Sequence, residues 1–113
     1  MTTTALNVTR TIRYSPIKGI INSAIVHWPS GCEGLVEIFL NIRTKQILPY
    51  PAKGSGGTNT GIALDNTIQS FSIDEAVDKN DPIEMVVYNH DSRKPHNISL
   101  ILKILTKQTY TGP

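Results

Sequence analysis

Three histidines, one cysteine and two methionines are the side chains that could bind a metal or attack a substrate. His27, His90 and His96 supply imidazoles, Cys32 supplies the thiol, and Met85 supplies a thioether. A blue-copper centre needs two imidazoles and a thiolate in one plane with a weak axial ligand, so the atoms for one exist. His90 and His96 flank a short polar stretch between two apolar runs. We expect both rings to be solvated or bonded to backbone in a hairpin loop, because imidazole has many roles besides metal binding.

The segments Asn80–Asn89 and Pro95–Ile98 resemble half of a blue-copper (cupredoxin) sequence. The resemblance implies a β-sandwich and gives His96 the place of the first copper ligand. The other ligands of that family follow this histidine, but no Cys, His or Met follows it here, and Cys32 lies upstream. Only a circularly permuted arrangement could restore the site. We therefore expect no copper and no other cofactor, and a cupredoxin-like metal-binding protein is the second alternative function.

Two other segments could be ligand sites, one for a metal ion and one for a phosphate. His90, His96 and Asp91 could bind Zn²⁺ or Ni²⁺, although this trio lacks a recognised ligand spacing. The Gly-rich segment 53–61 contains five glycines or serines but no Gly-Lys-Ser/Thr ending and no strand–loop–helix context. We interpret this segment as a flexible loop rather than as a phosphate-binding loop.

Cys32 lies between two glycines, Gly31 and Gly34, and follows His27 by five residues. A nucleophile elbow places its Ser or Cys between a strand and a helix, and no helix is predicted here. No third group that would orient the histidine can be identified. We expect a small buried thiol in a tight turn, with the glycines supplying positive φ, and we expect the protein not to be an enzyme.

Trp28 and Tyr50 are the aromatic residues that could form a ligand platform, because both lie beside prolines at the ends of predicted strands. Trp28 is the best candidate for an exposed ring, although packing in the core is the favoured alternative. Phe39 and Tyr88 lie within predicted strands, and we expect both in the core. A carbohydrate- or ligand-binding β-sandwich module is therefore the first alternative function.

Composition excludes several classes of protein. The chain has 113 residues, 39% of them apolar, and a formal net charge of +2. This near-neutral charge gives no reason to expect nucleic acid or an acidic membrane as a partner. A single cysteine allows no intrachain disulfide. The first residues lack the basic and apolar regions of a signal peptide, so we expect synthesis in the cytoplasm.

Short apolar, β-branched segments with turn residues between them predict an all-β protein. We expect one domain over residues 1–113, a seven- to eight-stranded antiparallel β-sandwich of jelly-roll or cupredoxin-like type. In the first strand, Val8, Ile12 and Tyr14 alternate with polar residues and should be half-buried. Ser72–Glu75 fits a capping box, which allows at most one helical turn before the proline that follows. The predicted strands are residues 7–14, 20–28, 35–42, 47–48, 62–64, 68–73, 83–88 and 98–105.

The last two predicted strands are apolar on both faces. In the final strand Ile101 falls on the face opposite to Ile98 and Leu100, and in the preceding strand Val86 alternates with Met85. Such strands are either covered on both sides or lend one face to a partner chain. We expect the second, with polar arms about residues 1–9 and 106–113 reaching to neighbouring copies.

The segment Ala24–Ile38, together with residues 47–49 and Pro95–Leu100, resembles small single-domain β-sandwich proteins of tailed phages and related viruses. That family consists of accessory virion proteins that decorate a capsid or build a tail or turret. The resemblance implies a non-enzymatic structural protein, a homo-oligomer on a larger virion or particle. A ring of copies is the expected arrangement, because heterologous contacts that close leave no free face.

Overall fold

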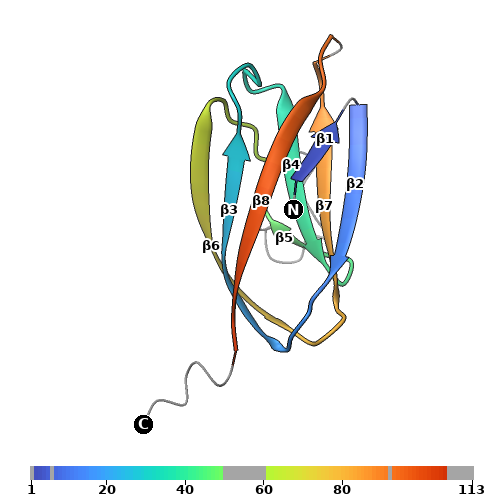
Figure 1. The fold of residues 1–113 in the computed structure, drawn as a ribbon, viewed down its shortest axis with the longest axis vertical. Helices are drawn as coiled ribbons and strands as arrows, with labels where there is room; N and C mark the ends of the chain where they lie inside the picture. The colour runs from blue at the N-terminus through green and yellow to red at the C-terminus, as the bar shows by residue number, and fades with distance from the viewer. Residues whose placement is uncertain (1, 6, 50–60, 92, 107–113) are drawn as a thin grey trace.

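Two four-stranded antiparallel sheets stack face to face in the computed structural model, which describes residues 2–5, 7–49, 61–91 and 93–106 (Figure 1). Successive strands lie in opposite layers, except β4 and β5, which form a hairpin in one sheet, and a single interior lies between the layers. They are β1 (Thr2–Ala5), β2 (Asn7–Tyr14), β3 (Gly19–Trp28), β4 (Val36–Ile42), β5 (Lys45–Leu48), β6 (Thr67–Val77), β7 (Pro82–Asn89) and β8 (His96–Leu105).

The strand order is that of a jelly roll. One sheet has the order β1-β8-β3-β6, which we call the β3 sheet, and the other has the order β2-β7-β4-β5, the β7 sheet. The antiparallel pairs β1–β8, β2–β7, β3–β6 and β4–β5 are those of one long hairpin rolled across two layers. The predicted antiparallel β-sandwich is therefore confirmed, and the order selects the jelly roll from the two predicted types.

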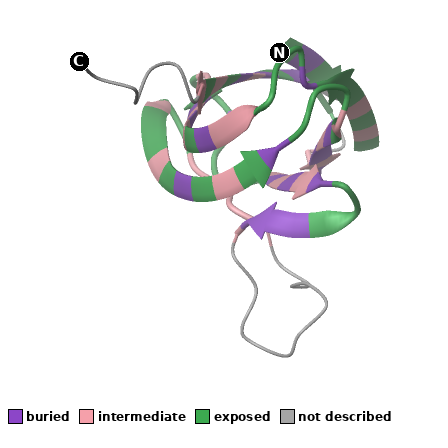
Figure 2. Ribbon diagram, turned by 90° about the horizontal axis from the view of Figure 1, so that it is seen from below, coloured by how far each residue is buried: buried purple, intermediate pink, exposed green. Residues whose placement is uncertain are grey.

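Alternating side chains of the central strands build the core. On β8, Leu100 is buried whereas Ile101 is 62% exposed, as the period of two residues predicts. On β7, Met85 and Val87 point inward and Val86 is buried on the opposite face. Figure 2 shows this alternation as bands of buried and exposed residues along the strands. The predicted two-faced apolar character of β7 and β8 is present in the fold.

Trp28 is completely buried at the end of β3. Its Nε1 donates a hydrogen bond to the carbonyl oxygen of Val36 at 3.1 Å, which joins β3 to the start of β4 in the other sheet. The ring of Phe71 meets the indole edge-on, with the centroids 6.4 Å apart. An indole is well suited to a core when its N–H finds an acceptor. The prediction that Trp28 offers an exposed ring is therefore wrong, and the core alternative is confirmed.

Strand β2 presents its apolar side chains to solvent, so the predicted burial of that face is wrong. Val8 and Ile12 pair with β7 residues that point outward, and they are 49% and 45% exposed. Thr9 and Thr11 instead point inward and are half-buried. The orientation of β2 follows from its place in the fold, because β2 is an edge strand and lies beside β1, whose Thr3 is buried. Short polar side chains suffice to line this narrow rim of the interior.

The N-terminal residues form strands where a polar arm was expected. Thr2–Ala5 pair with β8, and residues 7–9 begin β2. The Thr2 and Ser99 hydroxyls lie 3.3 Å apart, and the Thr4 hydroxyl donates to the side-chain oxygen of Asn97. Threonine favours strands, and β8 offers an edge that β1 can pair with. Residues 107–113 of the expected C-terminal arm and residues 53–60 of the Gly-rich loop lie outside the described residues.

Two smaller predictions around β6 are also wrong. Residues 72–75, read as a helical turn, lie inside β6, where β pairing with β3 overrides the local capping pattern. The predicted strand 62–64 is reduced to one bridge between Ile62 and Ile38. Within the described ranges, no helix is long and apolar enough to cross a membrane.

A group of charged side chains at the β4–β5 hairpin connects the two sheets. The hairpin turns at Arg43 and Thr44, whose φ angles are 52° and 71°. Arg43 donates hydrogen bonds to Asp81 at 2.7 Å, to Glu75 at 3.1 Å and to the Ala76 carbonyl at 3.0 Å. Glu75 and Ala76 belong to β6 of the opposite sheet, so this one guanidinium bridges both layers.

The hairpin turn generates a test of local strain. Positive φ is unfavourable for a β-branched residue and is tolerated by glycine. Thr44→Gly should therefore raise the free energy of unfolding by about 1 kcal/mol in urea denaturation followed by Trp28 fluorescence. The matched control is Thr67→Gly at the start of β6, which should instead lower that free energy by a similar amount. A loss of stability in Thr44→Gly would contradict the strained turn.

Candidate functional site

The β7–β8 loop is held closed by its own side chains. Asn89 donates to the Lys94 carbonyl oxygen at 2.8 Å and accepts from the Asp91 N–H at 2.9 Å. Asp91 in turn accepts from the Arg93 N–H at 2.9 Å, and its Oδ2 lies 2.9 Å from His96 Nε2. The hydrogen bond from His96, followed by that from Arg93, lowers the pKa of the Asp91 carboxyl below its usual value. His96 is buried, so the expectation of a solvated ring is wrong for this residue.

His90 points to a different carboxylate. Its exposed ring places Nε2 2.6 Å from Oε1 of Glu37 on β4. The other oxygen of Glu37 accepts the Gly61 N–H at 2.6 Å. The structure thus gives His90 and His96 separate acidic partners. In the part of the chain that the structure describes, no group of three or more His, Cys, Asp or Glu residues could hold a metal ion.

Cys32 is a buried thiol in a tight turn, as expected. Gly31 and Gly34 have positive φ angles of 101° and 72°, and the Leu35 N–H donates to the Cys32 carbonyl at 2.8 Å. Burial, and then the negative charges of Asp65 and Asp91, raise the pKa of the thiol. His27 is exposed on β3 and is not its partner in any hydrogen bond. A thiol that stays protonated is a poor nucleophile.

The predicted aromatic platform is not assembled by the described residues. Trp28 lies in the core, and Tyr50 lies outside the described residues. Phe39 and Tyr88 were expected in the core, but they stand half-buried on the outer face of the β7 sheet. Their rings meet edge-on with centroids 5.5 Å apart. Among the described residues, Phe39 and Tyr88 are therefore the only aromatic pair on an outer face, although both were predicted to lie in the core.

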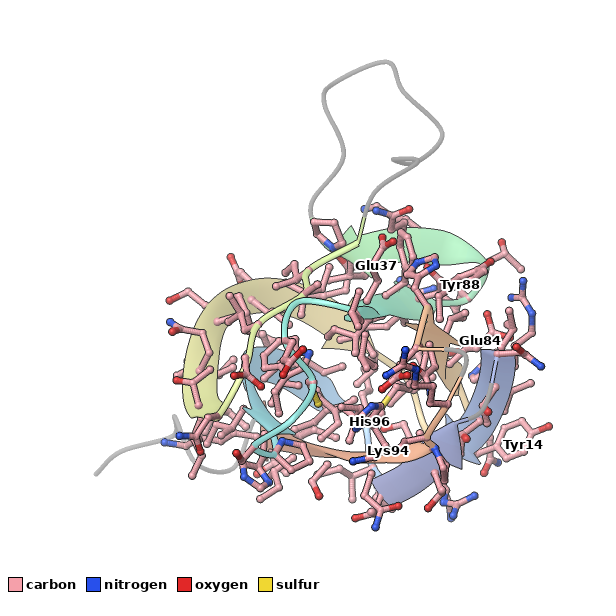
Figure 3. All side chains as sticks on the ribbon, turned by 90° about the horizontal axis from the view of Figure 1, so that it is seen from above. Tyr14, Glu37, Glu84, Tyr88, Lys94 and His96 are labelled. Atoms are coloured by element: carbon pink, nitrogen blue, oxygen red, sulfur yellow. The ribbon has the colours of Figure 1, made fainter. Side chains whose placement is uncertain are left out.

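A hollow of about 450 Å³ lies over this outer face. Three labelled members of the face, Glu37, Tyr88 and Glu84, come from β4 and β7 and lie on one side of the molecule in Figure 3, away from His96. The sequence carries a signal for it, since alternate positions on β4 and β7 are polar or aromatic, but the strand register was needed to align them. The lining residues are Arg10, Glu37, Phe39, Asn41, Gln46, Val86, Tyr88 and His90.

The outer face of the β3 sheet carries a different feature, a cluster of isoleucines. Ile25 on β3 is the direct cross-strand partner of Ile101 on β8, and Ile68 on β6 lies one pair further along the same face. Ile68 and Ile101 are 68% and 62% exposed. We call these three residues the isoleucine patch. Its neighbours on the same face are Ser70, Ser99, His27 and Lys103.

No protein-family model matches this chain, and no curated protein matches its sequence.

The Asp91–His96 contact generates a pH prediction. Because the folded-state pKa of Asp91 lies below its ordinary value of 3.8, the contact stabilises the fold above that value. This contribution is lost as the pH falls through the lowered pKa. Asp91→Asn should therefore be less stable than the wild type near neutral pH, and the difference should shrink on acidification below 3.8. Urea titrations across acidic pH measure it, with Glu33→Gln at an exposed position as the control. An unchanged gap between Asp91→Asn and the wild type would contradict it.

The buried thiol generates a labelling prediction. Cys32 is fully buried with a raised pKa, so a disulfide reagent should modify it only when the fold opens. The labelling rate of the native protein should be orders of magnitude below the rate in concentrated urea. Ser30→Cys in a Cys32→Ser background, exposed in the turn after β3, is the control and should label at once. Fast labelling of native Cys32 would restore it as a candidate nucleophile.

Proposed function

We propose that this protein is a non-enzymatic structural protein that assembles with copies of itself, as an accessory protein of a virion or a comparable particle. The single observation that carries the self-association is the isoleucine patch on the outer face of the β3 sheet. An isolated exposed isoleucine needs no explanation, but here Ile25 and Ile101 are direct partners across β3 and β8, and Ile68 lies diagonally from Ile25 on β6. Exposed apolar patches mark interaction sites.

The charges around the patch favour a second copy as the occupant. Lys103 on β8 and Asp74 on β6 are exposed on the same face, on opposite sides of β3 and toward the same end. A two-fold axis parallel to β3 places Lys103 of one copy over the Asp74 end of β6 in the other, and the reverse. The same axis stacks Ile25 on its own copy. A self-complementary surface of this kind is what an isologous interface requires.

The particle part of the proposal draws on two observations of a different kind. The jelly-roll strand order recurs in capsid proteins. The segments between residues 24 and 100 resemble accessory virion proteins. The ring of copies expected from the sequence stays a prediction. Immunogold labelling of virions or particles purified from the source of this sequence tests this part, and particles that carry no label would overturn it.

Self-association is tested by a pair of matched variants. Ile101→Lys places a charge in the isoleucine patch, and Ile12→Lys places the same charge on the outer face of the other sheet, at a residue of similar exposure. The wild type and Ile12→Lys should sediment as an oligomer, while Ile101→Lys should sediment as a monomer, with all three folded by circular dichroism. A wild-type protein that stays monomeric at the highest soluble concentration would refute the proposal.

A further inference from the structure

The hollow on the outer face of the β7 sheet combines an apolar floor with converging polar groups. Phe39 and Val86 are cross-strand partners on β4 and β7, and Tyr88 stands beside them one pair further along. Arg10 borders them from β2, and its partner on β7 is Val86. The volume of about 450 Å³ falls within the range of small-molecule sites. This face lies on the opposite layer of the sandwich from the isoleucine patch.

The aromatic part of the hollow is fixed in position. The rings of Phe39 and Tyr88 pack edge-on, with an interplanar angle of 76°. Gly61 lies against this pair so closely that a Cβ there would come within 2.9 Å of the Phe39 ring and 2.6 Å of the Ile38 carbonyl oxygen. The Phe39 ring therefore cannot move toward Gly61, and the pair presents a stable apolar surface to the hollow.

The polar part is held by contacts that leave further hydrogen-bonding capacity. Glu84 lies beside the hollow and holds two of its lining residues, because its Oε1 accepts from Asn41 at 3.0 Å and from Arg10 at 3.5 Å. Glu37 is fixed between His90 and the Gly61 N–H. Each carboxylate oxygen can accept more than one hydrogen bond. Positioned acceptors and donors therefore border the aromatic surface.

These groups suit a neutral sugar better than other ligands. The Glu37 carboxylate at the hollow disfavours an anionic ligand, and it already contacts His90 and the Gly61 N–H, which weakens the case for a cation. A lipid would leave these polar groups unpaired. A pyranose offers a C–H face for aromatic rings and hydroxyls that both donate and accept. We propose that the hollow binds a neutral pyranose of an oligosaccharide, stacked on Phe39 and Tyr88 with its hydroxyls on Asn41, Glu37 and Arg10.

The probe is a printed array of neutral and acidic oligosaccharides, followed by calorimetric titration of the neutral glycan with the strongest signal. The full-length wild type should bind neutral pyranose glycans. Glu37→Gln keeps the shape but removes the charge, and Tyr88→Ala removes one ring of the aromatic pair. Each variant should weaken binding by about tenfold or more, the loss of one good contact. Tyr88→Phe, which keeps the ring, should retain most of the affinity.

Ile101→Lys is the matched control, because it lies on the other sheet and should bind the glycan like the wild type. An array without signal for folded wild-type protein would overturn the proposal, as would a preference for acidic glycans. Unchanged affinity in both Glu37→Gln and Tyr88→Ala would overturn it too. Self-association rests on the opposite face, so either result leaves it standing, and a monomeric wild type leaves the sugar site standing.

Discussion

A sandwich of two sheets has one interior, and the side chains that this interior can bury determine which side chains remain on the two outer faces. Each sheet can bury one face only, so strands that are apolar on both faces leave apolar side chains outside. Ile98 and Leu100 fill the interior and thereby commit Ile101 to the surface. In β2 the polar side chains face inward instead: its threonines line the rim of the interior, and Val8 and Ile12 face solvent. The outer faces are therefore where function can reside.

Polar contacts at the ends of the strands hold the two layers in register without using the outer faces. Arg43 bridges the hairpin of the β7 sheet to β6 of the β3 sheet. At the other end, Asp65 accepts the N–H groups of Gly31 and Glu33, and Asp91 bonds to His96. Cys32 and His96, two of the residues that could bind a metal, lie within or beside these loops. The outer faces are left to differ, one with an isoleucine patch and the other with a polar and aromatic hollow.

The sequence predicted those parts of the fold that local pattern decides. Alternation located β3, β4, β7 and β8 to within a few residues, and glycines identified the turn that buries Cys32. The prediction failed where pairing with a distant strand determines the structure. β1 forms because it pairs with the edge of β8, and residues 72–75, which fit a capping box, are extended because β6 pairs with β3. The hollow was missed for the same reason, since Glu37 and Tyr88 meet only through the β4–β7 register. No pattern within a single strand encodes that register.

The central claim is that the isoleucine patch is covered in solution by another copy. A soluble paramagnetic probe reports it directly through the relaxation enhancement of isoleucine δ1 methyl groups in selectively labelled protein, measured at low and at high protein concentration. The account predicts that the enhancement at Ile68 and Ile101 falls as concentration rises, while that at the exposed Ile12 of the other sheet stays constant. Equal and undiminished enhancement at all three methyl groups would contradict it.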